Sequence, residues 1–235
     1  RIRRIFPALL VVITATFLFG FFILSPDEFS ALGKLVAAGI GFVANLVLWS
    51  EAGYFDAATE TKPLLHLWSL GIEEQFYIIW PLLLIFAWKR KISLLIVTMI
   101  VLFISFSFNI FNIKTDPIAT FYSPLTRIWE LLFGSVLSWI MVFKKDAFAN
   151  FNFKINKQLS RYKLFNNAEE KNIFANILSI LGIVLFIIGF VKITKESFFP
   201  GYWALVPVLG TVVIIMAGPE AWINKKILSN KLAVW

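Results

Sequence analysis

Cysteine is absent from the 235 residues, and histidine occurs only once, as His66. The absence of cysteine excludes disulfide bonds, thiolate catalysis and cysteine-ligated metals, and a single histidine argues against a histidine-based metal cluster. Charged residues are also scarce, at 15% of the chain. Internal repeats, heptad runs, low-complexity tracts and phosphate-cradling glycine patterns are missing as well. No metal site is therefore predicted.

Hydrophobic residues make up 59% of the chain, and the mean hydropathy of +0.81 lies far outside the range of soluble proteins. Several windows approach or exceed the roughly 20 apolar residues that cross about 30 Å of hydrocarbon as a helix. Apolar runs of this length exclude barrel strands, so the sequence predicts an all-α, polytopic transmembrane helical bundle. The predicted spans are residues 5–24, 32–49, 67–88, 92–113, 122–143, 173–191 and 202–218.

Lysine and arginine set the expected topology, because they concentrate on cytoplasmic loops. They cluster at residues 1–4, 89–91, 144–172 and 225–231. Three full spans between the first two clusters would place them on opposite sides of the membrane. Segment 32–49 is the least hydrophobic of the three and carries Lys34 and Asn45. We therefore predict that it is re-entrant or interfacial, and that residues 144–172 form a cytoplasmic basic loop near anionic lipid.

The most informative motif is HLWSLGIEEQFYIIWP at residues 66–81, which places ionisable groups inside a predicted span. Such a residue costs roughly 2.5 to 3.5 kcal/mol on insertion scales, which makes it a functional-site hypothesis by default. On a helix, residues at spacings of three and four share one side and here form a polar stripe of His66, Ser69, Glu73, Tyr77 and Trp80. Glu74 lies at the edge of this stripe, and Gln75 lies on the opposite side of the helix. A carboxylate near an imidazole can orient it as a general base, although the two glutamates could instead pair with buried arginines for assembly.

A second group of polar residues lies at residues 123–139. Arg127 and Glu130 stand one turn apart and can neutralise each other, and Gly134 and Ser138 form a small-xxx-small pair that lets another backbone come close. These features alone predict a structural role. An intramembrane arginine can also hold a phosphate or polar substrate, because its planar donors match anions bidentately.

The basic run at the start of the chain has two interpretations. Arg1, Arg3 and Arg4 can simply anchor the first span on the cytoplasmic side. Three guanidinium groups at a membrane surface can also grip a pyrophosphate or a nucleotide-bearing donor.

In its motifs, the chain resembles acyltransferase family 3, the multi-pass bacterial membrane acyltransferases that include O-antigen and other surface-glycan O-acetylases. The resemblance extends through nearly the whole chain and depends on five landmarks in the family's order. These are RIRRIFPAL at 1–9, EAGYFD at 51–56, HLWSLGIEEQFYIIWP at 66–81, SPLTRIWELLFGSVL at 123–137 and FPGYWALVPVLGT at 199–211.

The resemblance implies transfer of an acyl group, acetyl above all, from cytoplasmic acetyl-CoA to a hydroxyl of a cell-surface glycan such as O-antigen or another exopolysaccharide. The expected location is the bacterial cytoplasmic (inner) membrane, with membrane lipid, the acyl-CoA donor and the glycan acceptor as partners. Acetyl-CoA would be a substrate, so no tightly bound cofactor is expected, and no nucleic-acid partner is expected either.

The resemblance also assigns expected roles to residues. Arg1 and Arg4 match the family's RxxR positions and, with Arg3, would contact the phosphates of the donor. Glu73 and Glu74 match its paired glutamates. The catalytic candidates are Glu73, Glu74 and His66, and the substrate-binding candidates are Ser69, Tyr77, Arg127 and Glu130.

The family pattern extends beyond both ends of the chain. Its first span, with an arginine and an essential histidine, and its last spans are not among residues 1–235, and His66 is not equated with that histidine. Residues 1–235 are therefore expected to be a partial membrane acyltransferase domain that is inactive alone.

Two other classes of function stay open. Charged residues inside a bundle also line the substrate pathways of transporters and flippases, which would show repeat symmetry in hydropathy. A non-catalytic subunit of polymer export would tolerate neutralisation of Glu73 and Glu74.

Overall fold

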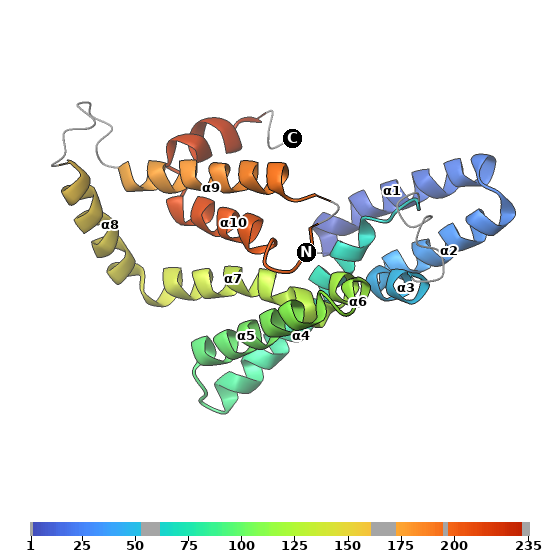
Figure 1. Ribbon diagram of the computed structural model, residues 1–235, viewed down its shortest axis with the longest axis horizontal. Helices are drawn as coiled ribbons and strands as arrows, with labels where there is room; N and C mark the ends of the chain where they lie inside the picture. The colour runs from blue at the N-terminus through green and yellow to red at the C-terminus, as the bar shows by residue number, and fades with distance from the viewer. Residues whose placement is uncertain (1, 53–61, 161–172, 195–196, 232–235) are drawn as a thin grey trace.

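The computed structural model describes residues 2–52, 62–160, 173–194 and 197–231 (Figure 1). Within these ranges the chain is helical and contains no strand, which confirms the all-α prediction. The α-helices are α1 (Ile2–Ile23), α2 (Pro26–Ile40), α3 (Ala44–Glu51), α4 (Leu67–Lys89), α5 (Leu94–Asn112), α6 (Pro117–Tyr122), α7 (Pro124–Phe143), α8 (Lys145–Ser160), α9 (Ile173–Lys192) and α10 (Leu205–Ala217).

Five of the described helical segments are long and apolar enough to cross a membrane. They are Arg3–Ile23, Leu67–Lys89, Leu94–Asn112, Pro117–Phe143 and Ile173–Lys192, which agree with five predicted spans to within a few residues. The predicted span 202–218 is shorter, because residues 201–204 form turns and α10 begins only at Leu205. Its 13 residues reach about 20 Å, less than the thickness of the hydrocarbon.

Segment 32–49 is not one continuous helix. α2 ends at Ile40, α3 begins at Ala44, and between them Phe42 has a φ of 55°, in the left-handed region. Neither α2 nor α3 is a candidate span, so two candidate spans remain before Lys89. An even number allows the basic clusters at 1–4 and 89–91 to lie on the same side, as the positive-inside rule requires.

Residues 145–160 form α8, so this part of the predicted basic loop 144–172 is helical. Four apolar residues, Phe148, Phe151, Ile155 and Leu159, recur at spacings of three and four and give the helix an apolar side. The ring of Phe151 lies 6.0 Å from that of Phe174 in α9. The Asn156 side-chain oxygen also accepts a hydrogen bond of 2.8 Å from the Phe174 N–H. Residues 161–172 lie outside the described ranges.

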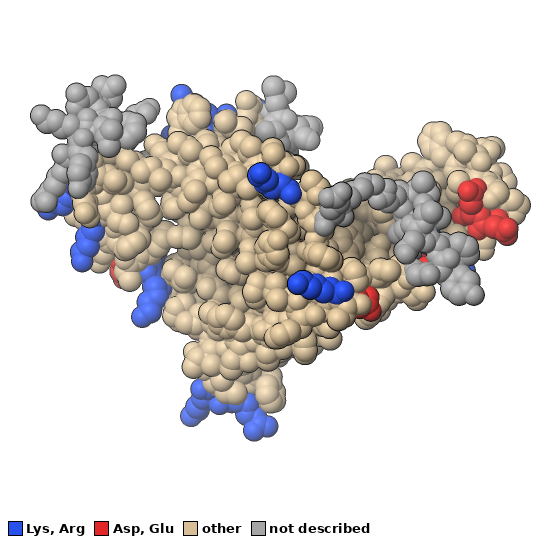
Figure 2. All heavy atoms as spheres, in the orientation of Figure 1, with Lys and Arg blue, Asp and Glu red and all other residues tan. Residues whose placement is uncertain are grey.

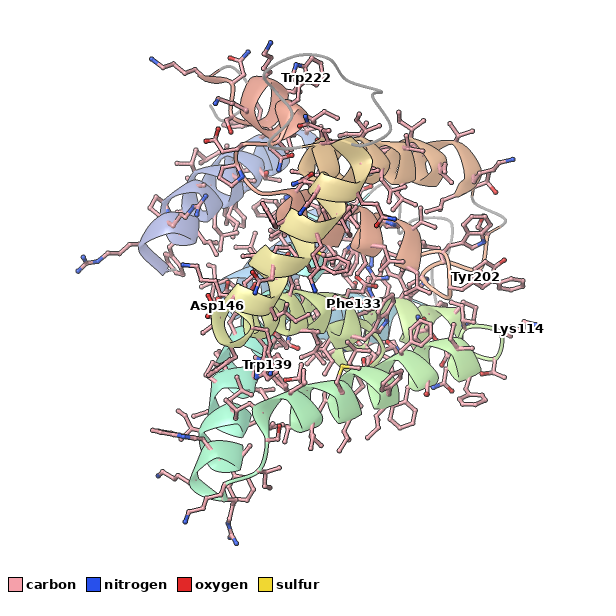
Figure 3. The ribbon with its side chains drawn as sticks, turned by 90° about the vertical axis from the view of Figure 1, so that its left-hand side faces the viewer. Lys114, Phe133, Trp139, Asp146, Tyr202 and Trp222 are labelled. Carbon is pink, nitrogen blue, oxygen red and sulfur yellow. The ribbon has the colours of Figure 1, made fainter. Side chains whose placement is uncertain are left out.

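α5 and α7 form an antiparallel pair at the centre of the molecule, and α4 packs against both (Figure 1). In Figure 3, Lys114, just after α5, and Asp146, at the start of α8, lie at opposite ends of this pair. Ser105 of α5 joins the two helices, because its hydroxyl donates to the Leu125 carbonyl at 2.6 Å and accepts from the Trp129 N–H at 3.2 Å. Trp129 and Leu132 of α7 are fully buried in this core.

The remaining helices extend from the core in two directions. α9 and α10 pack closely on one side of α7, and α1 and α2 form an arm that points away from it (Figure 1). The visible face in Figure 2 is largely uncharged, with lysine and arginine mainly near its periphery. Such a distribution is expected where apolar helix sides face lipid and charged ends face water.

Candidate functional site

The HLWSLGIEEQFYIIWP motif forms the first part of α4. His66 is the N-cap residue and is exposed, and the Ser69 hydroxyl donates to the His66 carbonyl at 3.2 Å. The Ser69 hydroxyl therefore makes a hydrogen bond within the first turn of α4.

The two glutamates point to different sides of α4. Glu74 is 8% exposed and Glu73 is half-buried. On a regular helix Glu73 shares a side with Tyr77, whereas Glu74 lies between that side and the side that carries Gly71. The two carboxylates therefore differ in direction and in burial.

The Gly71–Gln75 side of α4 packs against the break between α2 and α3. The Gln75 side-chain amide donates to the Phe42 carbonyl and to the Asn45 side-chain oxygen, both at 2.9 Å. A Cβ atom at Gly71 would lie 2.8 Å from that Asn45 oxygen, which shows how closely the backbones approach. Irregular backbone at membrane depth is tolerated only where protein or water satisfies it, and Gln75 supplies a donor there.

Asn45 connects this contact to a third element. It is fully buried, and its amide donates to the Tyr122 carbonyl at the end of α6 at 3.1 Å. Sequence reasoning placed Gln75 on the side opposite the polar stripe but assigned no role to it or to Asn45. The available signal was the i,i+4 pair of Gly71 and Gln75 together with the glycines around 39–41.

The arginine-bearing start of α1 meets the same break. Arg1 lies outside the described residues, and the side chains of Arg3 and Arg4 are exposed. The ring of Phe6, half a turn further on, lies 6.4 Å from the ring of Phe42 in an edge-on arrangement. Phe42 thus connects the first turns of α1 with Gln75 of α4.

α1 and α4 also share one buried apolar cluster. Leu9 and Ile13 of α1 lie in this cluster together with Leu67 of α4. Two of the landmarks, at 1–9 and 66–81, therefore contribute Leu9 and Leu67 to one apolar cluster, with Phe42 packed against it.

Arg127 lies where its own landmark meets two others, at 66–81 and 199–211. Its guanidinium carbon lies 5.2 Å from the ring centre of Trp68, 5.5 Å from that of Phe121 and 5.4 Å from that of Phe199. The predicted ion pair is confirmed, because a guanidinium nitrogen lies 3.2 Å from a Glu130 carboxylate oxygen. Cation–π contacts strengthen where water is excluded, and Arg127 is only 8% exposed. This geometry favours the structural interpretation of Arg127 and Glu130 over direct contact with a substrate.

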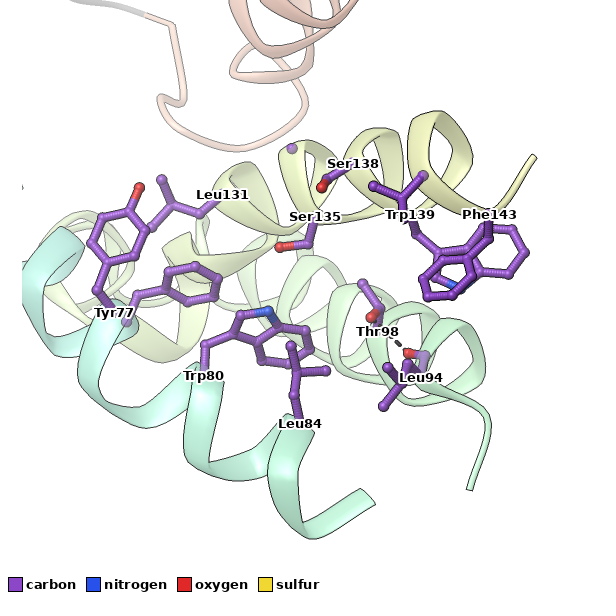
Figure 4. Close-up of a pocket in the computed structure, with 13 residues that line it drawn as sticks. Tyr77, Trp80, Leu84, Leu94, Thr98, Leu131, Ser135, Ser138, Trp139 and Phe143 are labelled. Carbon is purple, nitrogen blue, oxygen red and sulfur yellow. Dashed lines mark hydrogen bonds between the residues drawn. The ribbon is translucent and has the colours of Figure 1, made fainter. Parts of the chain in front are cut away.

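A groove of about 380 Å³ lies between α4, α5 and α7 (Figure 4). Its walls include Phe76, Tyr77 and Trp80 of α4, and Ser135, Ser138 and Trp139 of α7. Tyr77 and Trp80 belong to the polar stripe predicted from the sequence, so the Glu73 side of α4 continues into this groove.

The prediction of close backbone packing at Gly134 and Ser138 was wrong. A Cβ atom at Gly134 would meet nothing within 4 Å, and both residues line the groove. The small side chains leave an open space because no helix among the described residues fills it. Close packing of this kind occurs instead between α9 and α10, where a Cβ atom at Gly182 would lie 2.9 Å from the Gly210 carbonyl oxygen.

Among the described residues, no three histidine, aspartate or glutamate side chains are grouped so that they could hold a metal ion. The polar side chains of residues 66–77 are two carboxylates, an amide, hydroxyls and one imidazole, and the guanidinium groups of Arg3 and Arg4 are exposed at the start of α1. Such a set can bind an anionic substrate and move a proton without a metal.

Comparison with known proteins gives relatives that match nearly the whole chain. A Haemophilus influenzae protein, named only as uncharacterized, is 33% identical over 224 residues, which cover 92% of this chain and 83% of that protein. The peptidoglycan O-acetyltransferase OatA of Listeria monocytogenes is 31% identical over 241 residues, 100% of this chain and 36% of the relative. A Staphylococcus aureus (strain COL) protein named as a candidate O-acetyltransferase is 28% identical over 249 residues, 100% of this chain and 37% of the relative.

The chain thus spans little more than a third of the named O-acetyltransferases that it matches. No family model and no solved structure matches it. The chain belongs to the family of the H. influenzae protein, a family of multi-pass membrane proteins, and its end-to-end similarity to proteins named O-acetyltransferases supports an acyltransferase family.

Proposed function

We propose that the protein is a membrane-embedded O-acetyltransferase that moves an acetyl group from a cytoplasmic acyl-CoA donor to a hydroxyl of a cell-surface glycan. The observation that carries this proposal is the similarity of the whole chain to proteins named O-acetyltransferases. One of them is named for peptidoglycan, so peptidoglycan joins O-antigen and other exopolysaccharides as a candidate acceptor. The proposed location is the bacterial inner membrane.

The proposed reaction forms a bond between the acceptor oxygen and the acetyl carbonyl carbon. A base accepts the proton of the hydroxyl, the carbon–sulfur bond of the thioester breaks, and CoA leaves as the thiol after it takes up a proton. Because a sugar hydroxyl is a weak nucleophile, a positioned base can contribute about 10² to 10⁴ in rate.

The geometry suggests how the candidate residues share this work. Arg1, Arg3 and Arg4 would hold the donor phosphates, because their side of the molecule packs through Phe6 onto the break at 41–43. Glu74, the more buried of the two glutamates and the neighbour of Gln75, would be the catalytic carboxylate. Glu73, with Ser69 and Tyr77, would face the acceptor, and exposed His66 would exchange protons at the end of α4.

The test uses membranes that contain the full-length protein, radiolabelled acetyl-CoA and glycan. We expect Glu74→Gln and Arg4→Ala to reduce label transfer at least tenfold, and Glu73→Gln to have the smaller effect. Glu220→Gln is the matched control, because Glu220 is exposed and pairs only with the nearby Lys225, at 2.8 Å, among its described contacts. Full transfer by Glu74→Gln would remove Glu74 from the mechanism.

A transporter or flippase is the second candidate, favoured by the discontinuous α2–α3 segment. Transporter substrate sites are often formed by interrupted helices. If the wild-type protein transfers no label while glycan is present, but proteoliposomes move a labelled glycan precursor, the enzyme proposal fails. A non-catalytic export subunit would tolerate both Glu73→Gln and Glu74→Gln.

A further inference from the structure

The groove between α4, α5 and α7 has the shape of a slot for a hydrocarbon chain. Phe76 and Trp80 form a buried, stacked pair with ring centres 5.6 Å apart, and Trp139 and Phe143 form a second aromatic pair at 5.6 Å (Figure 4). Along α7 the groove extends from Leu131 to Phe143. This corresponds to about 18 Å of helix, close to the roughly 15 Å thickness of one leaflet's hydrocarbon.

Polar groups along the groove are few. The Thr98 hydroxyl already donates to the Leu94 carbonyl of its own helix at 2.8 Å, as the dashed line in Figure 4 shows. The hydroxyls of Tyr77, Ser135 and Ser138 and the indole N–H groups of Trp80 and Trp139 are the other side-chain polar groups on its walls. A lining of this kind suits an acyl chain better than a nucleotide, whose polar atoms would lack partners.

One end of the groove lies beside a cluster of cations. Leu94 and Phe143 line the groove at the end where α4 finishes, α5 starts and α7 finishes. Here the chain carries five exposed basic residues: Lys89, Arg90, Lys91, Lys144 and Lys145. In the part of the chain that the structure describes, none of the five forms an ion pair.

The groove is open along its α7 wall, where Gly134 and Ser138 line it and are exposed. On the opposite side of α4, Leu82, Ile85 and Phe86 expose 63%, 48% and 57% of their surface, as expected where this helix faces lipid. A lipid could therefore enter the groove sideways from the membrane. Basic pockets between transmembrane helices on the cytoplasmic side are known to bind anionic lipid headgroups.

We propose that this groove is a binding site for an anionic phospholipid. One acyl chain lies between α4, α5 and α7 over Phe76 and Trp80, and the phosphate of the headgroup is held by the cations of residues 89–91 and 144–145. The cations at one end of the groove complement an anionic headgroup, and the apolar groove is about as long as the hydrocarbon of one leaflet is thick. Together these features favour an anionic phospholipid as the ligand. The groove adjoins Tyr77, which the proposed function assigns to the acceptor, but lipid binding here does not depend on acetyl transfer.

Native mass spectrometry of the detergent-solubilised full-length protein tests the site with palmitoyl-oleoyl phosphatidylglycerol and the matching phosphatidylcholine. We expect the wild-type protein to retain phosphatidylglycerol preferentially. Replacement of Lys89, Arg90 and Lys91 by glutamine should weaken phosphatidylglycerol binding about tenfold or more, because each cation near a headgroup contributes several-fold. Lys225→Gln with Lys226→Gln, which removes cations elsewhere, should have no effect.

Gly134→Leu tests the slot itself, because its side chain would project into the open space at Gly134. Gly33→Leu is the matched control, since Gly33 lies in α2 and a Cβ there also meets nothing within 4 Å. We expect Gly134→Leu to lose bound phosphatidylglycerol and Gly33→Leu to keep it. If Gly134→Leu does not yield folded protein, Ser138→Phe fills the same groove from its exposed edge.

Two results would overturn the proposal. One is equal retention of phosphatidylglycerol by wild-type protein and a folded groove-filled variant. The other is displacement of the lipid by acetyl-CoA in the wild-type protein but not in Gly134→Leu. That result would assign the groove to the acyl-CoA donor.

Discussion

Gly71→Ala and Gly134→Ala are the same substitution in two membrane-spanning helices, and we expect them to change stability in opposite directions. A glycine inside a helix costs roughly 0.8 to 1 kcal/mol relative to alanine, so both variants gain that amount from the backbone. At Gly134 nothing lies within 4 Å of the new methyl group, and nothing offsets this gain. Gly134→Ala should therefore stabilise the protein by nearly 1 kcal/mol.

At Gly71 the new methyl group meets two atoms. It would lie 2.8 Å from the Asn45 side-chain oxygen and 3.2 Å from the Phe42 carbonyl oxygen. Asn45 cannot easily move aside, because it is fully buried and held by hydrogen bonds to Gln75 and Tyr122. Overpacking costs about 2 kcal/mol and a strained interhelical hydrogen bond about 0.6 kcal/mol. After the helix gain is subtracted, Gly71→Ala should destabilise the protein by about 2 kcal/mol.

Thermal unfolding in detergent, followed by tryptophan fluorescence, measures both changes. At roughly 2 to 4 °C per kcal/mol, Tm should rise by about 2 to 4 °C in Gly134→Ala and fall by about 4 to 8 °C in Gly71→Ala. The cost of Gly71→Ala should shrink in an Asn45→Ala background, because one of the two clashing atoms is then gone. An equal rise in Tm for both glycine variants would show that α4 does not pack against the α2–α3 break.

Three further predictions concern other contacts. Asn45 and Gln75 share a hydrogen bond of 2.9 Å. In a double-mutant cycle of unfolding, Asn45→Leu and Gln75→Leu should therefore show a coupling free energy of about 0.6 kcal/mol, and at most about 1.7 kcal/mol. Additive effects of the two substitutions would contradict this hydrogen bond. Glu130→Met should destabilise the protein by about 3 to 5 kcal/mol, because it leaves Arg127 buried without its partner. The double variant with Arg127→Met and Glu130→Met should recover part of this loss. A double variant that is less stable than Glu130→Met would refute the account. The backbone N–H and the hydroxyl of Ser25 donate to Glu28 and lower its pKa below the ordinary value of a glutamate. This capping contribution is therefore present above the unfolded-state pKa and is lost as the pH falls through the folded-state pKa. Tm of the wild-type protein should fall more than that of Glu28→Gln on acidification, and parallel pH profiles would contradict this account.

The fold class and five of the spans could be predicted from the sequence, because a span needs only a long apolar run that satisfies its own backbone. The Arg127–Glu130 ion pair could be predicted for a similar reason, since two residues three apart on a helix are neighbours wherever the helix lies. The helix at 145–160 was also encoded locally, in the spacing of Phe148, Phe151, Ile155 and Leu159, but the abundant lysine and asparagine obscured it.

Contacts between helices depended on the tertiary structure. The i,i+4 spacing that joins Gly71 and Gln75 does not say which helix they face, and only the fold shows that they meet Phe42 and Asn45. The same limit explains the error at Gly134 and Ser138, because two small residues permit close packing and a groove equally well. Hydropathy and spacing report which residues leave water and which share a helix side. Partners distant in sequence are chosen by packing, and packing also decided that Glu74 is more buried than Glu73.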